Sequence, residues 1–567
     1  MAVGVRARRV LAVAAIAAAT IAGTGCGGKS GDGDASDGTG TTEAARTTTA
    51  EGVEETGLAE AGAPKRGGKV VYGLEAETTG GWCLPEAQLA VSGAMVANAV
   101  YDPLMYADVD GKPKPYLAES VTGNDDGTTW TVRLRDGVTF HDGSTLDAEV
   151  VKNNLLAGLG KYEGRSGSLG PVILSDVKGV EVVEPMTVRI TTAPWPAFPS
   201  YLTSARVMAQ AQLDDPDRCD RDLIGTGPFR FESWTPNQAL VVERNPDYWQ
   251  VAPDGEPYPY LDEIEFRPVP EELARMNGFE AGDLDVVHTS VAKSIGGPLT
   301  DLADDGKANL LVSDRFAEIN YTLLNAGRPP FDDARFRRAV AHAIDREALN
   351  ETVNDGHATV ASGPFAPGVI GHLDDSGFPE HDPAKAEALV KEYVADGGKP
   401  SFVFTLTQDP GSIQRGELIQ EQLADVGIEM RIDPIDQSTL INRAVGGKFQ
   451  SLAFRNLGGA DPDAAYAWWV GKDSVLNLGN IDDPEIDRLM KAGRAETDEA
   501  TRTEIYEDVN RRFAEQVWNV WSWYTRWGVA EQADVHGVLG PELPDDGGDP
   551  YNGLSGGHRV LGLWRSD

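Results

Sequence analysis

Cysteine is the residue type in this chain whose side chain most readily forms covalent bonds, and Cys26 has the clearest context. It follows Gly23, Thr24 and Gly25, and small residues before a cysteine resemble a lipobox, at which the cysteine is lipidated. The large aliphatic residue that is usual three places before the cysteine is replaced by Gly23. We therefore expect lipidation at Cys26, and the alternative is a secreted protein with a spare cysteine.

The two remaining cysteines are Cys83 and Cys219. Cysteines of exported proteins pair readily, so we expect a disulfide between them, and the alternative is two buried free thiols. No CxxC, histidine cluster or EF-hand spacing is present, so we expect no metal and no cofactor. The zinc-protease motif His-Glu-x-x-His is absent as well, and we expect no catalytic residues.

The net charge excludes some classes of partner, and the N-terminal composition predicts where the protein is located. A formal net charge of -39 argues against nucleic acid and against anionic lipid surfaces, because both require a basic patch. A basic start followed by the short apolar stretch 10–22 predicts a signal peptide over residues 1–25. Residues 26–66 are rich in Gly, Ser, Thr, Asp and Glu, which predicts a flexible linker behind the lipidated cysteine.

Strand and helix patterns alternate along the rest of the chain. Residues 69–74 read as the first strand, and 130–135 alternate as a strand that we expect to form a hairpin with 138–141. Ser144 or Thr145 is then placed to cap a helix. Asp332 or Asp333 is placed to cap one later helix and Asp382 another, because an apolar stripe at helical spacing follows each of them. A chain of 567 residues predicts at least two domains, and the interleaved elements predict α/β lobes.

A series of phrases in fixed order carries a family resemblance, from about residue 69 to about residue 527. The phrases are LRDGVTFHDG (134–143), GTGPF (225–229), NPDYW (245–249), LDEIEFRP (261–268), GDLD (282–285), PFDDARFRRA (330–339), AIDR (343–346), QLADVGI (422–428) and DPD (461–463). The chain resembles the solute-binding lipoproteins of the dipeptide, oligopeptide and nickel class of ABC importers, which are the family 5 solute-binding proteins.

The resemblance implies an α/β fold of the periplasmic binding protein kind, type II, in the large class with an extra subdomain. Lobe I is expected over 67–312 and 525–567, with the subdomain inserted at about 101–195, and lobe II over 313–524. The solute lies in a cleft between the lobes, which close by a hinge. Most of the quoted phrases are then scaffold rather than solute contacts.

The resemblance also places the solute-contacting loop just before the DPD phrase. In peptide-binding members an aspartate there pairs with the free amine of the peptide, and a tryptophan precedes it. Counting back from Asp461, these positions fall on Gly458 and Arg455. A guanidinium suits a carboxylate, phosphate or polyol, so Arg455 is expected to bind an acidic or hydroxylated group. The alternatives are that Arg455 pairs with an acidic residue of the chain, or that Asp461 is the carboxylate that holds an amine.

Several further residues are candidates for the walls of the cleft. Asn456 and Gly459 belong to the same loop, Trp82 and Leu84 follow the first strand, and Trp468 lies on a helix after the loop. Trp82 is suited to stacking on a solute, although a core or hinge role is the alternative. The even spacing of Trp521, Trp523 and Trp527 predicts one shared face of an extended strand, and core packing is favoured for it over a carbohydrate platform.

These features predict an exported binding protein rather than an enzyme. We expect it to capture a peptide or peptide-like solute outside the membrane and deliver it to an ABC permease with a separate ATPase. It would act as a lipid-anchored monomer at the outer face of the membrane or in the periplasm. The alternatives are a non-peptide solute, such as an oligosaccharide, opine or acidic conjugate, and a sensor or chaperone role with the same fold.

Overall fold

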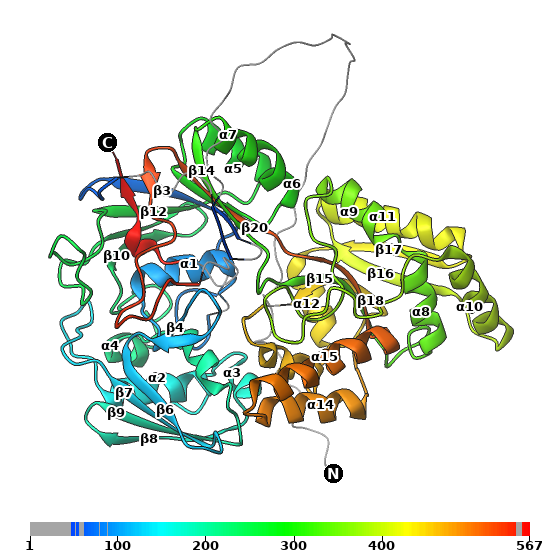
Figure 1. Cartoon of the computed structure of the whole chain (residues 1–567), viewed down its shortest axis with the longest axis horizontal. Coiled ribbons are helices and arrows are strands. Elements are labelled where there is room, and N and C mark those ends of the chain that lie inside the picture. Colours follow the sequence, from blue (N-terminus) through cyan, green and yellow to red (C-terminus); the bar gives the residue numbers. More distant parts are fainter. Residues whose placement is uncertain are drawn as a thin grey trace, which may run out of the picture.

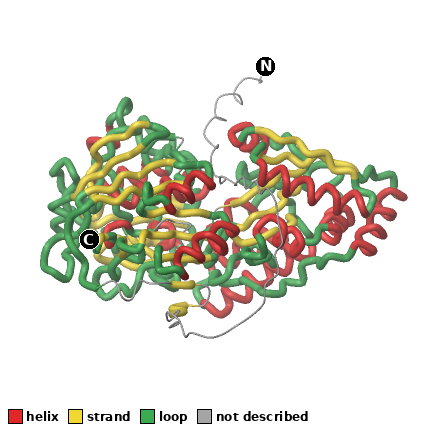
Figure 2. The backbone as a smooth tube through the Cα atoms, turned by 90° about the horizontal axis from the view of Figure 1, so that it is seen from above, coloured by secondary structure: helices red, strands yellow, loops and turns green. Residues whose placement is uncertain are grey.

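The computed structural model describes residues 47–50, 53–55, 62–551 apart from 79, 88 and 457, and 558–566. The expected signal peptide over residues 1–25 and the expected lipidation site at Cys26 lie outside the described residues. The elements form two bodies, each built around its own sheet, and they lie side by side (Figure 1). Helices and strands alternate in both bodies (Figure 2), as expected for α/β lobes.

Lobe I is built on a sheet in the order β1-β2-β14-β20-β13-β3-β12-β11-β10. β3 runs parallel to both of its neighbours, β12 and β13, while β20 pairs antiparallel with β13 and β14. Buried valine, tyrosine and phenylalanine side chains of the central strands form the core of this lobe. The strands are β1 (Thr47–Ala50), β2 (Val53–Glu55), β3 (Lys69–Leu74), β10 (Phe229–Thr235), β11 (Ala239–Arg244), β12 (Glu263–Pro268), β13 (Val286–Thr289), β14 (Ala308–Ser313) and β20 (Trp527–Gln532).

A separate sheet, in the order β6-β7-β9-β8, lies where the inserted subdomain is expected and has its own apolar core. Its strands are β6 (Ala118–Gly123), β7 (Thr129–Leu134), β8 (Val177–Glu184) and β9 (Thr187–Thr192), with helix α2 (Ala148–Gly158) against them. The predicted hairpin is wrong: β7 pairs with β6 and β9, so both of its edges are already used, and Thr139 bridges only Thr145. The side chain of Asp147, rather than Ser144 or Thr145, caps α2.

Lobe II is built on a second sheet, in the order β17-β16-β18-β15-β19. The strands are β15 (Ile319–Leu324), β16 (Ser401–Thr407), β17 (Glu429–Ile435), β18 (Ser451–Asn456) and β19 (Asn519–Tyr524). Its helices include α8 (Ala334–Ala343), α9 (Arg346–Asn354), α10 (Pro383–Ala395), α11 (Pro410–Asp425), α12 (Gln437–Val445), α14 (Pro484–Ala495) and α15 (Glu499–Gln516). The predicted caps are confirmed, because Asp333 accepts a backbone N–H at the start of α8 and Asp382 does so at the start of α10.

Two antiparallel strands pass together from one lobe to the other. β14 of lobe I leads into β15 of lobe II, and β19 of lobe II leads back into β20 of lobe I. These strands are neighbours in both sheets, since β14 pairs with β20 and β15 pairs with β19. Across the crossing, Glu318 accepts hydrogen bonds from the Thr525 N–H (2.8 Å) and from Nε1 of Trp527 (2.7 Å). We propose residues 314–318 and 525–526 as the hinge between the lobes.

Part of the segment expected to be a flexible linker is a hairpin. β1 and β2 pair with each other, and β2 adds to β14 at the edge of the lobe I sheet, with Glu55 opposite Leu311. The prediction for 26–66 rested on the scarcity of large apolar side chains, whereas an edge strand is joined through its backbone N–H and C=O groups. Composition therefore could not reveal this pairing.

Cys83 and Cys219 form a disulfide, as the sequence analysis expects. The bridge joins the loop that follows β3 to the segment after α4 (Gln210–Asp214), and it closes a loop with a sequence separation of 136 residues. Both sulfur-bearing residues are buried in the lobe I core.

Replacing both cysteines by serine is expected to lower the free energy of unfolding. A cross-link over a loop of this length restricts the unfolded chain, and its removal costs about 2–5 kcal/mol. Chemical denaturation of the oxidised wild type and of the Cys83→Ser/Cys219→Ser protein measures the difference. Equal midpoints and equal slopes for the two proteins would contradict the expectation.

Candidate functional site

Arg455 lies on β18, next to the crossing strands, and its side chain is half-buried. It forms no ion pair or hydrogen bond with the described residues, although the chain contains 89 acidic residues. Its guanidinium carbon lies 5.6 Å from the centre of the Trp527 ring, an arrangement typical of a cation–π contact. The alternative that Arg455 pairs with an acidic residue of the chain is therefore wrong in the described part of the structure.

Arg455 is one of three residues that stand side by side on one face of the lobe II sheet. Asn320 on β15 is in register with Arg455 on one side and with Trp523 of β19 on the other. Since adjacent strands lie about 4.8 Å apart, the Cα atoms of Arg455 and Trp523 are separated by roughly 10 Å. We call Arg455, Asn320 and Trp523 the recognition row. It stands at the ends of its strands nearest the crossing to lobe I.

Trp527 fixes Arg455 from the lobe I side. Its indole N–H donates to Glu318, and its ring stacks on His288 with the ring centres 5.7 Å apart. His288 is buried, and burial lowers its pKa well below the usual value, so the ring is neutral and adds no competing positive charge. The carboxylate of Glu318 is held by Trp527 and makes no ion pair with Arg455.

Gly458 occupies the position at which the resemblance would place an amine-binding aspartate. A Cβ atom added there would lie 2.3 Å from the carbonyl oxygen of Phe316 and 2.5 Å from the carbonyl carbon of Ala317. Both are backbone atoms of the crossing segment, so no side chain fits without moving the hinge. The loop therefore excludes the aspartate for a structural reason. Asn456, buried beside it, has an Oδ1 atom with no hydrogen-bond partner among the described residues.

Asp461 was an alternative candidate for the amine-binding carboxylate, and the structure places it differently. Its two carboxylate oxygens accept hydrogen bonds from Arg502 at 2.7 and 2.8 Å. One of them also accepts the backbone N–H of Asp463 and caps a short helix, η4 (Pro462–Ala465). The carboxylate is thus fully engaged in local structure, and we remove Asp461 from the proposed solute contacts.

The aromatic candidates Trp82 and Trp468 are core residues. Trp82 is 1% exposed and packs edge-on against Trp234, beside the disulfide, with Leu84 against the same core. Trp468 is buried in the core of lobe II and packs on Phe454. Gly459 approaches Ala464 of the following short helix rather than the recognition row.

The shared face predicted for the late tryptophans is also wrong. A β-bulge in β19 places Trp521 opposite Tyr321 and Trp523 opposite Asn320, so the two rings lie on opposite faces of the sheet. Trp527 belongs to the next strand, in the other lobe. Even spacing predicts a shared face only in a regular strand, and the bulge depends on pairing that the local sequence does not reveal.

A polar contact holds the inserted subdomain against lobe II. Asp463, which is fully buried, accepts hydrogen bonds from Trp195 Nε1 (2.6 Å), from the Tyr201 hydroxyl (3.1 Å) and from Arg494 (2.8 and 3.0 Å). Arg494 in turn reaches Asp176 of the subdomain at 3.0 Å. Burial raises the pKa of Asp463, while the charge of Arg494 opposes that shift. We call these five residues the interlobe latch.

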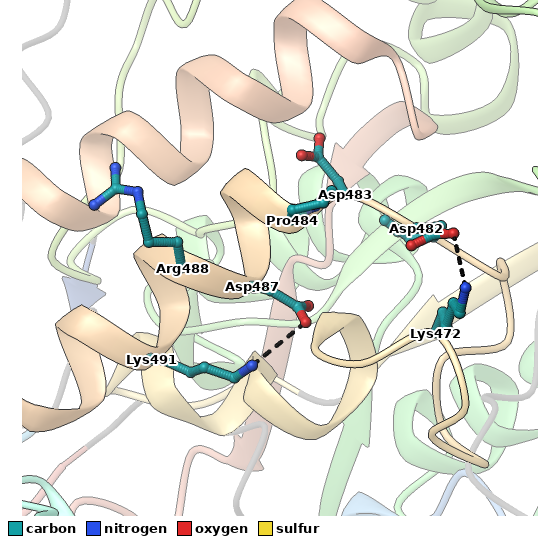
Figure 3. A pocket seen from close by; sticks show the side chains of 8 residues that line it. Lys472, Asp482, Asp483, Pro484, Asp487, Arg488 and Lys491 are labelled. Atoms are coloured by element: carbon teal, nitrogen blue, oxygen red, sulfur yellow. Dashed lines mark hydrogen bonds and ion pairs between the residues drawn. The ribbon is translucent and has the colours of Figure 1, made fainter.

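A pocket of about 320 Å³ lies elsewhere, on lobe II alone, at the start of α14 (Figure 3). Four of its charged side chains pair within the pocket, Lys472 with Asp482 and Lys491 with Asp487, while Asp483 pairs with Arg512 and Arg488 with Glu485. It shares no residue with the recognition row. We favour the recognition row, beside the crossing to lobe I, over this pocket as the candidate solute site.

Comparison with known proteins identifies the family. Residues 112–477 match the model of the bacterial extracellular solute-binding proteins, family 5 Middle. The chain belongs to this family. The match covers well over half of the chain, and it includes the sheet of the inserted subdomain and the loop of the recognition row.

Curated relatives are glutathione-binding proteins. The protein GsiB of Salmonella paratyphi A is 31% identical over 355 residues, which cover 60% of this chain and 65% of the relative. GsiB of Escherichia coli K12 is 26% identical over 435 residues, which cover 73% of this chain and 80% of the relative. The match thus spans about two thirds of the length of the first of these.

Solved structures share the fold. The protein AgaA of A. tumefaciens R10, in complex with agropinic acid, has a TM-score of 0.75 at 25% identity and covers 88% of this chain and 99% of its own. The oligopeptide-binding protein AppA of Bacillus subtilis, in complex with a nonapeptide, has a TM-score of 0.73 at 23% identity and covers 89% of this chain and 100% of its own. The two-lobe α/β fold predicted from the sequence is confirmed.

Among the described residues, no helix combines the length and apolarity needed to cross a membrane. That part of the chain also lacks any group of three or more His, Cys, Asp or Glu side chains placed to hold a metal ion.

Loss of one latch hydrogen bond is expected to shift the protein toward an open arrangement of the lobes. Trp195→Phe keeps the ring but removes the indole N–H that Asp463 accepts, which leaves a buried carboxylate with one donor fewer. The radius of gyration from small-angle X-ray scattering of solute-free protein should increase. Trp130→Phe is the matched control, because the Trp130 N–H is buried in the same subdomain without a partner. An unchanged radius for Trp195→Phe would contradict the latch.

Proposed function

We propose that this protein captures a small acidic solute outside the cell membrane and delivers it to the permease of an ABC importer. A separate ATPase subunit would supply the energy. The protein would act as a monomer anchored through a lipid on Cys26, with no catalytic step of its own. The family to which the chain belongs supports the solute-binding role, and the acidic class of the solute rests on the site.

The observation that carries the acidic class is the unpaired guanidinium of Arg455. A half-buried cation without a counter-charge is unfavourable, and a carboxylate offers two oxygens that match its fork of donors. The same loop has no room for the aspartate that would hold a peptide amine, because Gly458 is pressed against the hinge backbone. The candidate site therefore contains a positive charge at Arg455 and lacks a negative charge at position 458.

Relatives and structural neighbours include proteins whose names state acidic solutes. Two of them are a glutathione-binding protein and a protein solved with agropinic acid. We propose the same chemical class for this chain: an acidic peptide conjugate or an opine-like acid. An ordinary peptide with a free N-terminus would lack its usual counter-charge here.

The experiment is native mass spectrometry of the purified mature protein, followed by denaturation and identification of the released compound. A small molecule with at least one acid group is expected in the wild type. Arg455→Ala should bind that compound about 30-fold or more weakly, since removing one partner of a buried charge pair costs about 2 kcal/mol or more. Arg511→Ala is the matched control, because Arg511 is exposed on α15 and pairs with Glu507.

Two outcomes would contradict the proposal. One is a population of ordinary peptides that is retained equally by the wild type and by Arg455→Ala. The other is a neutral sugar whose affinity does not change in Arg455→Ala.

A further inference from the structure

Arg415 is a second buried or half-buried arginine of lobe II whose side chain makes no ion pair and no hydrogen bond with the described residues. It lies on α11, is 7% exposed, and has its Nε and Nη2 atoms buried without a hydrogen-bond partner in the described residues. Buried polar atoms in folded proteins nearly always have partners, and a buried arginine with two unpartnered nitrogen atoms is therefore exceptional. Its guanidinium carbon lies 5.5 Å from the centre of the Trp523 ring, an arrangement typical of a cation–π contact.

The fold does not neutralise this charge. Burial lowers the pKa of Arg415 to about 10, which leaves the side chain charged at neutral pH. Asp409 is the acidic residue that stabilises the charge through space, but it makes no ion pair with Arg415. Its two carboxylate oxygens instead accept hydrogen bonds from the Ser412 N–H at the start of α11 and from the Thr407 hydroxyl. The Nε and Nη2 donors of Arg415 therefore have no acceptor among the described residues.

Arg415 contacts Trp523, which belongs to the same recognition row as Arg455. Trp523, which lies under Arg415, is in register with Asn320, and Asn320 is in register with Arg455. Both guanidinium groups therefore lie on one face of the lobe II sheet, with an aromatic ring and an amide between them. Since the row spans roughly 10 Å between the Cα atoms of Arg455 and Trp523, a single small molecule is long enough to reach both.

We propose that Arg415 and Arg455 bind two separate acidic groups of one solute, whose middle part lies along Trp523 and Asn320. The inference rests on the proposed function and makes its solute class narrower: a small diacid rather than a monoacid. Each guanidinium would take one carboxylate through paired N–H donors. Asn320 and the Trp523 ring are 8% and 7% exposed in this structure, so an apolar or hydroxylated linker between the two acids would contact them only after the lobes separate at the crossing.

The number of acid groups on the solute tests the proposal directly. The compound released from the wild-type protein is esterified with methanol, and the methyl esters are counted by mass spectrometry. Two or more esters are expected, and one or none would overturn the proposal. A diacid that is lost from Arg455→Met but retained by Arg415→Met would also overturn it while leaving the proposed function intact. Retention by both variants would overturn both.

Stability provides a second readout that does not require the solute. Arg415→Met in protein stripped of solute replaces an unpaired buried charge by an apolar chain, so the Tm should rise by about 1–4 °C. The matched control is Arg502→Met, because Arg502 is similarly buried but paired with Asp461, and its Tm should fall. A fall in Tm for Arg415→Met would show that Arg415 is a structural residue and would overturn the proposal.

The conservative variant separates charge from geometry. Arg415→Lys keeps the positive charge but loses the planar fork of donors. It should weaken binding of the released diacid less than Arg415→Met does, where the loss should be about 30-fold or more. Equal affinity of Arg415→Met and the wild type for that diacid would contradict a contact with the solute.

Discussion

The crossing of two paired strands between the lobes is the constraint on which the rest of the structure depends. β14 and β20 are neighbours in one sheet, and their continuations β15 and β19 are neighbours in the other. The pairing fixes the register of Asn320 against Trp523, and β18 then adds Arg455 on the far side of β15. A change of register by one residue would turn these side chains to the opposite face. The site is therefore specified by the same hydrogen bonds that join the lobes.

The crossing also limits which residues the loop between β18 and Asp461 can contain. Gly458 passes so close to the carbonyl groups of Phe316 and Ala317 that its lack of a side chain is a packing requirement. A loop with an aspartate at this position would have to run at a greater distance from the hinge. The acidic residues just after the loop have become structural: Asp461 binds Arg502, and Asp463 is the centre of the interlobe latch. The proposed solute class and the contact between the lobes would thus depend on neighbouring residues of one short segment.

Local signals in the sequence predicted elements well and predicted their partners poorly. The strand at residues 69–74 and the caps at Asp333 and Asp382 depend on side chains close in sequence, and all three are confirmed. The partner of β7 and the bulge between Trp521 and Trp523 depend on strands far away in the chain, so alternation alone gave wrong answers for both.

The candidate site shows the same division. The departure at Arg455 was visible by counting from Asp461, whereas its lack of a partner needed the fold. Arg415 carried a signal that the sequence analysis did not use: it stands four and eight residues before Ile419 and Leu423, on the buried stripe of α11. A charged residue on an apolar stripe is expensive unless something neutralises it. The prediction that Trp82 contacts the solute was wrong, because an aromatic side chain after a strand is as suited to a core as to a solute site.

Arg415 and Arg455 make no ion pair with any described residue, which is unexpected in a protein with a net charge of -39. At long range such a protein repels an anionic solute, but at physiological ionic strength charges more than about 8 Å apart are largely screened. An acidic exterior therefore reduces the rate of encounter only modestly, while acidic side chains beside Arg415 and Arg455 would compete directly for their donors. In the described structure such neighbours are either absent from the row or, like Glu318 and Asp409, already held by other groups. Selectivity for the proposed acidic solute would then depend on keeping these few carboxylates engaged, and not on the overall charge.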